Sequence, residues 1–243
     1  MDELCEKALL VGQLDSRCST LIEAGLPPER IRARVAQTKE DRRNAFRLRY
    51  EVYVAEQGKP YPDADHRQRL LVDELDEAAT ILIVEEAGQV VGTLRANWFN
   101  SQAAQREYPE MFTRIRASDV EASRVAVCSR LAVRPDHRHS RTRGLLFESI
   151  YAIGLARETA LCFATCVPSL VRLFSRYGFH EYDRPFRDLT VGPLHRMVLA
   201  LDDLQNLERN RSPFLQVANK RSLTHASRPL SQLFARKADE PAA

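Results

Sequence analysis

Two carboxylates and three guanidinium groups occur at positions that a compact fold can bring together. Asp73 and Asp76 lie three residues apart, Arg49 lies in a predicted helix, and Arg95 and Arg130 lie on predicted strands. An unpaired charge that faces inward from a strand is costly to bury, so these arginines favour buried partners. In such a network each group keeps its partner charged, and a carboxylate there can orient an ammonium group or accept its proton. The alternative is a surface ion-pair network, which contributes little.

A basic loop offers a second kind of chemistry. Residues 131–144 read LAVRPDHRHSRTRG and join a predicted strand to a predicted helix that begins directly after Gly144. Backbone N–H groups at the start of a helix carry partial positive charge and lack partners within the helix, so this junction can bind a phosphate. Arg138, Arg141 and Arg143 add full charges, and guanidinium groups suit phosphate geometry. A solvated basic loop is the alternative.

The cysteines and histidines do not predict a metal site. Cys162 and Cys166 lack zinc-site spacing and a second ligand pair, and alternation along a buried strand explains them better. His137 and His139 flank Arg138, where we expect phosphate contact or solvent exposure. The chain has five cysteines, an odd number, and its acidic first residues lack the basic region of an export signal. We therefore expect free thiols and a cytoplasmic location.

Composition narrows the class of protein without naming a partner. The 243 residues are 44% hydrophobic and 28% charged, which is ordinary globular usage and excludes a collagen-like or wholly disordered chain. The net charge of +3 is too balanced to indicate nucleic acid, and we expect no nucleic-acid partner. The apolar runs are far shorter than the ~20 residues of a membrane-spanning helix.

The elements that must position these residues follow from periodicity and from turn residues. They are a strand at 32–38, a helix at 39–57, hairpin strands at 81–84 and 90–94, a strand at 123–133, a helix at 145–157, a strand at 161–167, a helix at 170–177 and a strand at 195–201. Residues 61–69 are predicted as a loop, and 100–118 as an irregular or helical excursion interrupted by Pro109. Early antiparallel pairing and late strand–helix–strand connections predict an α/β fold, a mixed central sheet with helices on both faces.

We divide the chain into three parts. We expect residues 1–32 to form an N-terminal helical extension, 33–202 a single α/β domain, and 203–243 a polar, partly disordered tail with an excess of lysine and arginine. The basic charge of the tail makes peripheral membrane contact an expectation for that segment.

The strand, loop and helix around the basic loop resemble the acyl-CoA-binding core of the GNAT acyltransferase superfamily. The resemblance rests on Val133-x-Pro135-x-x-Arg138, followed by a helix, a strand and the run LFSRYGF at 173–179. It implies two splayed strands that form an acyl-pantetheine cleft, with backbone groups of Leu131 and Val133 on the pantetheine and the loop on its phosphates. The two loop glycines usual in the superfamily correspond to Arg141 and Arg143, with Gly144 one place late. The tyrosine often used as general acid corresponds to Phe174, so a plain acetyl-CoA acetyltransferase is less favoured.

Four further motifs are similar to the acyl-homoserine-lactone (autoinducer) synthases and closer still to the long-chain N-acyl amino acid synthases. They are RLRYEVYVAEQG at 47–58, DELD at 73–76, GTLR at 92–95 and SRLAV at 129–133. The similarity spans residues 34–201 and implies that Arg49, Asp73, Asp76, Arg95 and Arg130 belong to the catalytic site. The homoserine-lactone synthases carry a glutamate as the proposed base two residues before the Ser-Arg pair, where this chain has Val127. Glu121 or a water chain is a candidate substitute, the base stays unassigned, and lactone formation is not supported.

The resemblance implies a function and its partners. We expect an N-acyltransferase that moves a long fatty acyl group from acyl carrier protein to the amine of an amino acid or a similar small amine. The phosphopantetheine thioester of the carrier protein, or acyl-CoA, would be a co-substrate, with no permanently bound cofactor and no metal. An acyl-CoA- or acetyl-CoA-dependent N-acetyltransferase is one alternative, and a non-catalytic acyl-binding or regulatory module is another.

Overall fold

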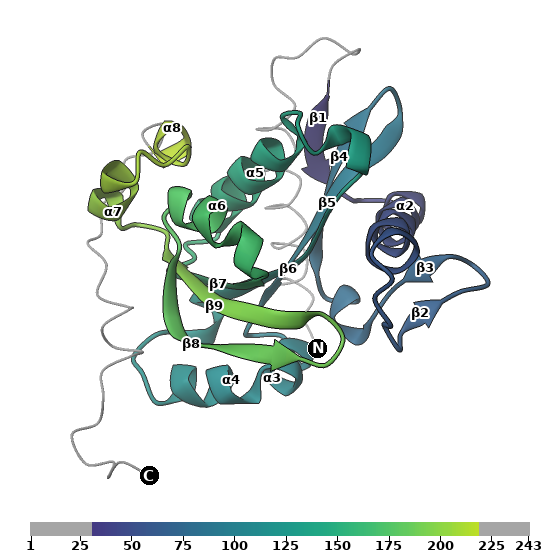
Figure 1. Ribbon diagram of the computed structural model, residues 1–243. Coiled ribbons are helices and arrows are strands. Elements are labelled where there is room, and N and C mark those ends of the chain that lie inside the picture. Colours follow the sequence, from purple (N-terminus) through teal and green to yellow (C-terminus); the bar gives the residue numbers. More distant parts are fainter. Residues whose placement is uncertain (1–30, 219–243) are drawn as a thin grey trace, which may run out of the picture.

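The computed structural model describes residues 31–218, which build one mixed seven-stranded sheet in the order β1-β4-β5-β6-β7-β9-β8 (Figure 1). The strands of this sheet are β1 (Arg32–Val35), β4 (Thr80–Glu86), β5 (Gln89–Trp98), β6 (Val125–Val133), β7 (Leu161–Cys166), β8 (His180–Asp188) and β9 (Gly192–Ala200). All neighbouring pairs are antiparallel except β6 and β7, which are parallel. Within residues 31–218, no helix combines the length and apolar character needed to cross a membrane.

Helices cover both faces of the sheet, as the α/β prediction requires. Successive residues of a strand point to opposite faces, and β4 is buried on both. Leu82 and Val84 pack into the cluster that contains Leu146 of α5 (Thr142–Ala156), whereas Ile81 and Ile83 pack against α2 (Lys39–Arg49). Figure 1 shows α5 and α6 (Val171–Arg176) on one side of the sheet and α2 on the other.

Helix α2 begins as the sequence predicts and then changes its winding. Thr38 caps it, because the Thr38 hydroxyl accepts the Asp41 N–H at 3.0 Å and the Asp41 carboxylate accepts the Thr38 N–H. From Tyr50 to Glu56 the chain continues as the π-helix η1, and Gly58 with φ +63° follows it. Together α2 and η1 occupy the span predicted as one helix.

Three predicted connections contain additional structure. The predicted loop at 61–69 contributes to a small hairpin of β2 (Ala64–Asp65) and β3 (Leu70–Leu71). The excursion forms α3 (Gln102–Glu107) and α4 (Pro109–Arg116), separated where Pro109 starts the second helix. Strand β8 was missed because it is an edge strand whose polar residues are mostly exposed.

The domain extends further toward the C-terminus than predicted. Two helices, α7 (Leu204–Arg209) and α8 (Leu215–Ala218), follow β9, and Leu207 of α7 and Phe214, just before α8, are buried. The Phe214 ring stacks on that of Tyr151 of α5, with the ring centres 4.2 Å apart. The prediction of a peripheral tail from residue 203 is therefore wrong for 204–218, because a few well-placed apolar residues anchor a segment that lacks periodicity. Nearly all of the predicted N-terminal extension, and the remaining tail with its expected membrane contact, lie outside the described residues.

Candidate active site

The structure brings together the two carboxylates and three guanidinium groups singled out from the sequence. Asp73 Oδ2 accepts hydrogen bonds from Arg130 Nε and Nη2 at 3.1 and 2.6 Å, and Asp73 Oδ1 pairs with Arg95. Asp76 Oδ1 lies 2.7 Å from Arg49 Nη1 and 3.3 Å from Arg95 Nη1. We call these five side chains the ionic cluster.

Each member of the ionic cluster is positioned by a different local structure. Arg49 ends α2, Arg95 lies in β5, and Arg130 lies in β6. Asp73 caps the short 3-10 helix η2 (Glu74–Asp76), and Asp76 is its last residue. In this capping box the Asp73 carboxylate accepts the Leu75 N–H and the Asp76 carboxylate accepts the Asp73 N–H, both at 3.0 Å. The turn itself therefore places the two carboxylates side by side, where the three arginines pair with them.

Burial and pairing set the charges of the cluster. Burial lowers the pKa of Arg49, which is fully enclosed, and the neighbouring Asp76 carboxylate opposes that shift. Burial disfavours the ionised form of Asp73, but Arg95 and Arg130 outweigh it and hold the Asp73 pKa below its ordinary value. Asp73 is therefore a carboxylate at neutral pH, with both oxygens already engaged.

A β-bulge places Arg130 close to the point where β6 separates from β7. The register with β5 passes from Thr93 opposite Ala132 to Arg95 opposite Ser129, so Arg130 and Leu131 together face the single residue Leu94. Arg130 has φ +54°, a left-handed conformation that costs on the order of 1–3 kcal/mol in a side-chain-bearing residue. Its ion pair with Asp73 and its position 4.6 Å above the centre of the Tyr61 ring hold it there.

Just before the bulge, β6 and β7 separate, as the resemblance to the GNAT superfamily implied. Their parallel pairing runs from Val125 opposite Leu161 to Cys128 opposite Ala164 and then stops, while β6 continues along β5 and β7 along β9. Residues of both separating ends line one cavity, with Ser129, Arg130 and Leu131 on one side and Thr165 and Cys166 on the other.

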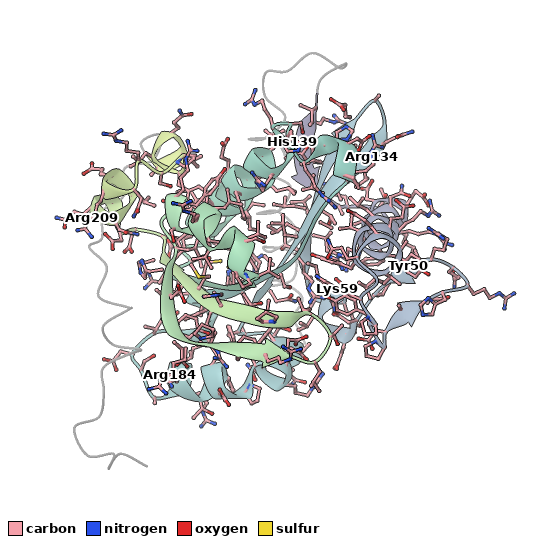
Figure 2. All side chains as sticks on the ribbon, in the orientation of Figure 1. Tyr50, Lys59, Arg134, His139, Arg184 and Arg209 are labelled. Carbon is pink, nitrogen blue, oxygen red and sulfur yellow. The ribbon has the colours of Figure 1, made fainter. Side chains whose placement is uncertain are left out.

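This cavity of about 740 Å³ joins a polar end to an apolar end. The polar end contains Asp73, Arg95 and Arg130 of the ionic cluster together with Lys59, Tyr61, Glu107 and Tyr108. Figure 2 shows Lys59 close to the turn that joins β8 and β9. The apolar end is lined by core side chains of α5, α6 and the segments that follow, which include Phe147, Ile150, Phe174, Phe179 and Phe214.

The arginines of the basic loop do not line this cavity, and two basic side chains of the loop are already paired with carboxylates. Arg138 Nη1 and Nη2 donate to the two carboxylate oxygens of Glu56 at 2.7 and 2.6 Å. His137 bonds Asp136 at 2.7 Å and Glu86 at 2.6 Å, and these bonds raise the His137 pKa above its ordinary value. Figure 2 shows Arg134 and His139 at the β1–β4 end of the sheet, away from Lys59.

Other residues predicted for phosphate and pantetheine contact divide between the cavity and its surroundings. Leu131 lines the cavity, and its backbone oxygen accepts a hydrogen bond from the Tyr53 hydroxyl. Val133, Arg138, Arg141, Arg143 and Gly144 do not line it. Helix α5 begins at Thr142 instead of after Gly144, because Thr142 is fully buried and its N–H is held by Ser140.

The cavity lining also bears on the unassigned base. Val127 is buried in β6, and Phe174 packs between the rings of Phe147 and Phe179 at 5.5 and 5.2 Å, so neither position supplies a proton-transfer group. Glu121 is exposed before the 3-10 helix η3 (Ala122–Arg124), 3.4 Å from the Ser123 hydroxyl, and does not line the cavity.

Sequence reasoning missed Lys59, Tyr61, Glu107 and Tyr108. Lys59 follows the helix terminator, Tyr61 lies in the predicted loop, and the other two lie in the irregular excursion, where no periodicity assigned a face. The only signal was the concentration of tyrosines and charges around the two segments, which is too common on protein surfaces to indicate a site.

Comparison with known proteins agrees with this geometry. Residues 44–200 match the family described as N-acyl amino acid synthase FeeM. The L-ornithine N(alpha)-acyltransferase of Rhodobacter capsulatus is 30% identical over 185 residues, which are 71% of this chain and 65% of that protein. The chain thus spans slightly less than two thirds of the length of this relative.

Solved structures resemble the chain in fold. FeeM, an N-acyl amino acid synthase from uncultured soil microbes, matches with a TM-score of 0.60 and 17% identity over 77% of this chain and 98% of its own. LasI, an AHL synthase, matches with a TM-score of 0.57 and 13% identity over 71% and 91%. BjaI, a CoA-dependent acyl-homoserine lactone synthase, matches with a TM-score of 0.57 and 20% identity over 72% of this chain and 84% of its own. The GNAT-like fold expected from the sequence is confirmed, and since the family match covers more than half of the chain, the protein belongs to the N-acyl amino acid synthase family.

Proposed function

We propose that the protein is an N-acyltransferase that moves a long fatty acyl group from acyl carrier protein to the amine of an amino acid. The observation that carries this proposal is one cavity that joins an ionic cluster to an apolar chamber through the gap between β6 and β7. The long acyl chain of a thioester needs apolar surroundings, the charged amine needs an ionic site, and the two must lie side by side for the amine to reach the thioester. The Rhodobacter relative is an ornithine N-acyltransferase, which supports an amino acid as acceptor.

The donor would lie in the gap between the separating strands. Pantetheine amides can pair with backbone groups of β6 beyond Cys128, near Leu131 and Val133, where β7 no longer pairs with it. At the bulge, backbone N–H groups near Leu131 would face the thioester oxygen and stabilise the negative charge that forms on it during attack. The donor would displace water from this gap, and the interaction would be stronger because the local dielectric constant is then lower.

The acyl chain would occupy the apolar end of the cavity. Phe147, Ile150, Phe174 and Phe179 are each less than a tenth exposed and present no charged group to it. Burial of each methylene contributes about 0.8 kcal/mol, so this end favours long chains over an acetyl group. Phe174, which stands where many GNAT enzymes have a tyrosine, thus has an apolar packing role here.

The acceptor would bind beside the ionic cluster. Asp73 stays ionised and can orient an ammonium group, while Arg130, whose guanidinium stacks on Tyr61, offers positive charge to an amino acid carboxylate. Arg49 and Arg95 are almost fully buried and hold the two aspartates in place. We assign Asp73 and Arg130 to acceptor binding and Arg49, Asp76 and Arg95 to positioning.

The basic loop would meet the phosphate of the carrier protein arm, in the cytoplasm where that donor is made. A phosphopantetheine arm has one phosphate, whereas coenzyme A has a diphosphate and a nucleotide phosphate. Arginines at 141 and 143 in place of glycines reduce close backbone approach, which suits the smaller group. Arg138 would exchange Glu56 for this phosphate, and the neighbouring arginines would contact an acidic carrier surface.

The test compares matched donors. The full chain is incubated with palmitoyl carrier protein or palmitoyl-CoA and a panel of amino acids that includes ornithine, and products are identified by mass spectrometry. We expect an N-acyl amino acid from the carrier protein donor, and loss of it in Arg130→Met but not in Arg116→Met, which changes an exposed arginine away from the cavity. Turnover with CoA alone overturns the assigned donor, and binding of both donors without thioester cleavage overturns the enzyme in favour of an acyl-binding module.

A further inference from the structure

Five acidic side chains line the cavity, and most of them are already engaged. They are Asp73, Glu107, Glu110, Asp183 and Asp188. Both Asp73 oxygens are bonded to arginines, and the arginines keep the Asp73 pKa low, so Asp73 is a weak proton acceptor. Asp188 Oδ1 accepts the Thr190 and Val191 N–H groups, and Asp183 Oδ1 accepts the Arg184 N–H.

Glu107 differs from these because it lines the same cavity as the ionic cluster but forms no ion pair with the arginines of the cluster. It is the last residue of α3, and α3 packs against η2. Arg106 forms an ion pair with Glu74 across this packing, and the residues next to them in sequence, Glu107 and Asp73, both line the cavity. Among the hydrogen bonds of residues 31–218, none is accepted by the Glu107 carboxylate.

The electrostatic surroundings of Glu107 suit proton transfer. Partial burial, and then the negative charge of Asp73, raise the Glu107 pKa above its ordinary value, while Arg95 and Arg130 moderate the shift. A raised pKa makes a carboxylate a stronger base at neutral pH. Glu110, which also lines the cavity, is exposed as Glu107 is, but it lies in the next helix, α4, and not in α3, which packs against η2.

We propose that Glu107 is the general base that deprotonates the acceptor ammonium, an inference that rests on the proposed function. The ammonium gives one proton to Glu107, and the neutral nitrogen attacks the thioester carbon to form the C–N bond. The tetrahedral intermediate then expels the thiolate as the C–S bond breaks, and the second nitrogen proton ends on that sulfur. Because Glu107 is also exposed at the mouth of the cavity, it returns its proton to water before the next turnover.

The test measures kcat/KM against pH for the full chain and for Glu107→Gln, Glu110→Gln and Glu121→Gln. In the wild type, kcat/KM should fall as the pH drops through the raised pKa of Glu107. At neutral pH, kcat/KM of Glu107→Gln should be about 10²–10⁴-fold lower than that of the wild type. The acid limb should also disappear, so that kcat/KM of this variant keeps rising with pH until the amine of the free acceptor is deprotonated. Glu110→Gln and Glu121→Gln should keep the wild-type profile.

Two further readouts separate a base from a structural residue. Glu107→Gln should keep the wild-type KM for the acyl donor and the wild-type melting temperature. It should also recover rate with an aminooxy analogue of the acceptor, whose nucleophilic nitrogen is already uncharged at neutral pH. A Glu107→Gln variant with the wild-type rate and acid limb overturns the inference, as does loss of the limb in Glu121→Gln. An inactive wild type would instead contradict the proposed function.

Discussion

Replacement of Asp76 by asparagine tests whether the ionic cluster is a buried network that depends on charge balance. Asp76 is 2% exposed, and its carboxylate is the hydrogen-bonding partner of Arg49, which is 0% exposed. Arg49 has two further side-chain nitrogens, Nε and Nη2, without hydrogen-bond partners in the described part of the chain. Asp76→Asn removes the negative charge that pairs with this guanidinium and leaves Arg95 repelling it.

The expected loss in the free energy of unfolding is about 3–5 kcal/mol, the usual cost of leaving a buried charge without its partner. The matched control is Glu74→Gln in the same 3-10 helix. Glu74 pairs with Arg106, and both side chains are more than half exposed, so its loss should cost at most about 1 kcal/mol. The double variant Arg49→Met/Asp76→Asn should recover most of the loss, because it removes the stranded charge.

Equilibrium unfolding in urea measures these differences through the midpoint at unchanged m-value. If Asp76→Asn is no less stable than Glu74→Gln, the Arg49–Asp76 pair is not the buried charge pair described above. If the double variant is no more stable than Asp76→Asn, the loss comes from the capping role of Asp76 instead of from the stranded charge of Arg49.

Three other predictions concern the chamber, the basic loop and its histidine. Ile150→Phe narrows the apolar end and should shift donor preference to shorter acyl chains. The expected change in kcat/KM is about fourfold for each methylene excluded, at about 0.8 kcal/mol each. Competition between donors of graded length measures this preference, and an unchanged preference would place the acyl chain outside the apolar end. Arg138→Ala should raise the KM for carrier protein at unchanged kcat, and Glu56→Gln, which frees Arg138, should lower it; equal KM values for both variants would exclude a phosphate role. The His137 pKa is raised by two carboxylates, so its stabilising contribution is complete below the ordinary histidine pKa and is lost as pH rises through the raised value. Thermal melting from pH 6 to 9 should show this decline in the wild type and not in His137→Gln, and parallel curves would contradict it.

The sequence predicted the ionic cluster because several of its constraints are local. Asp73 and Asp76 are fixed by one turn, and Arg95 lies on a strand between Leu94 and Ala96, so its charge required a partner. The hairpin of β4 and β5 and the helices on both faces followed from runs of apolar residues with clear boundaries. These features combine local propensity and burial, which agree in this part of the chain.

Features that depend on long-range pairing were not predictable. The Glu56–Arg138 ion pair joins residues 82 positions apart, and nothing near either residue indicates that the loop charge is already compensated. Strand β8 is held by its pairing with β9 and buries little of itself, so its polar sequence resembles a loop. Glu107 lines the same cavity as the cluster because α3 packs against η2, a tertiary contact that no local pattern indicates.

Mass spectrometry of lipids extracted from a bacterial host tests the central claim most directly, because one product mass reports both the acyl chain and the amine. Cells expressing the full chain should contain a new N-acyl amino acid that is absent with Arg130→Met and present with Arg116→Met. Unchanged lipids in cells that contain the folded wild-type protein would contradict the account.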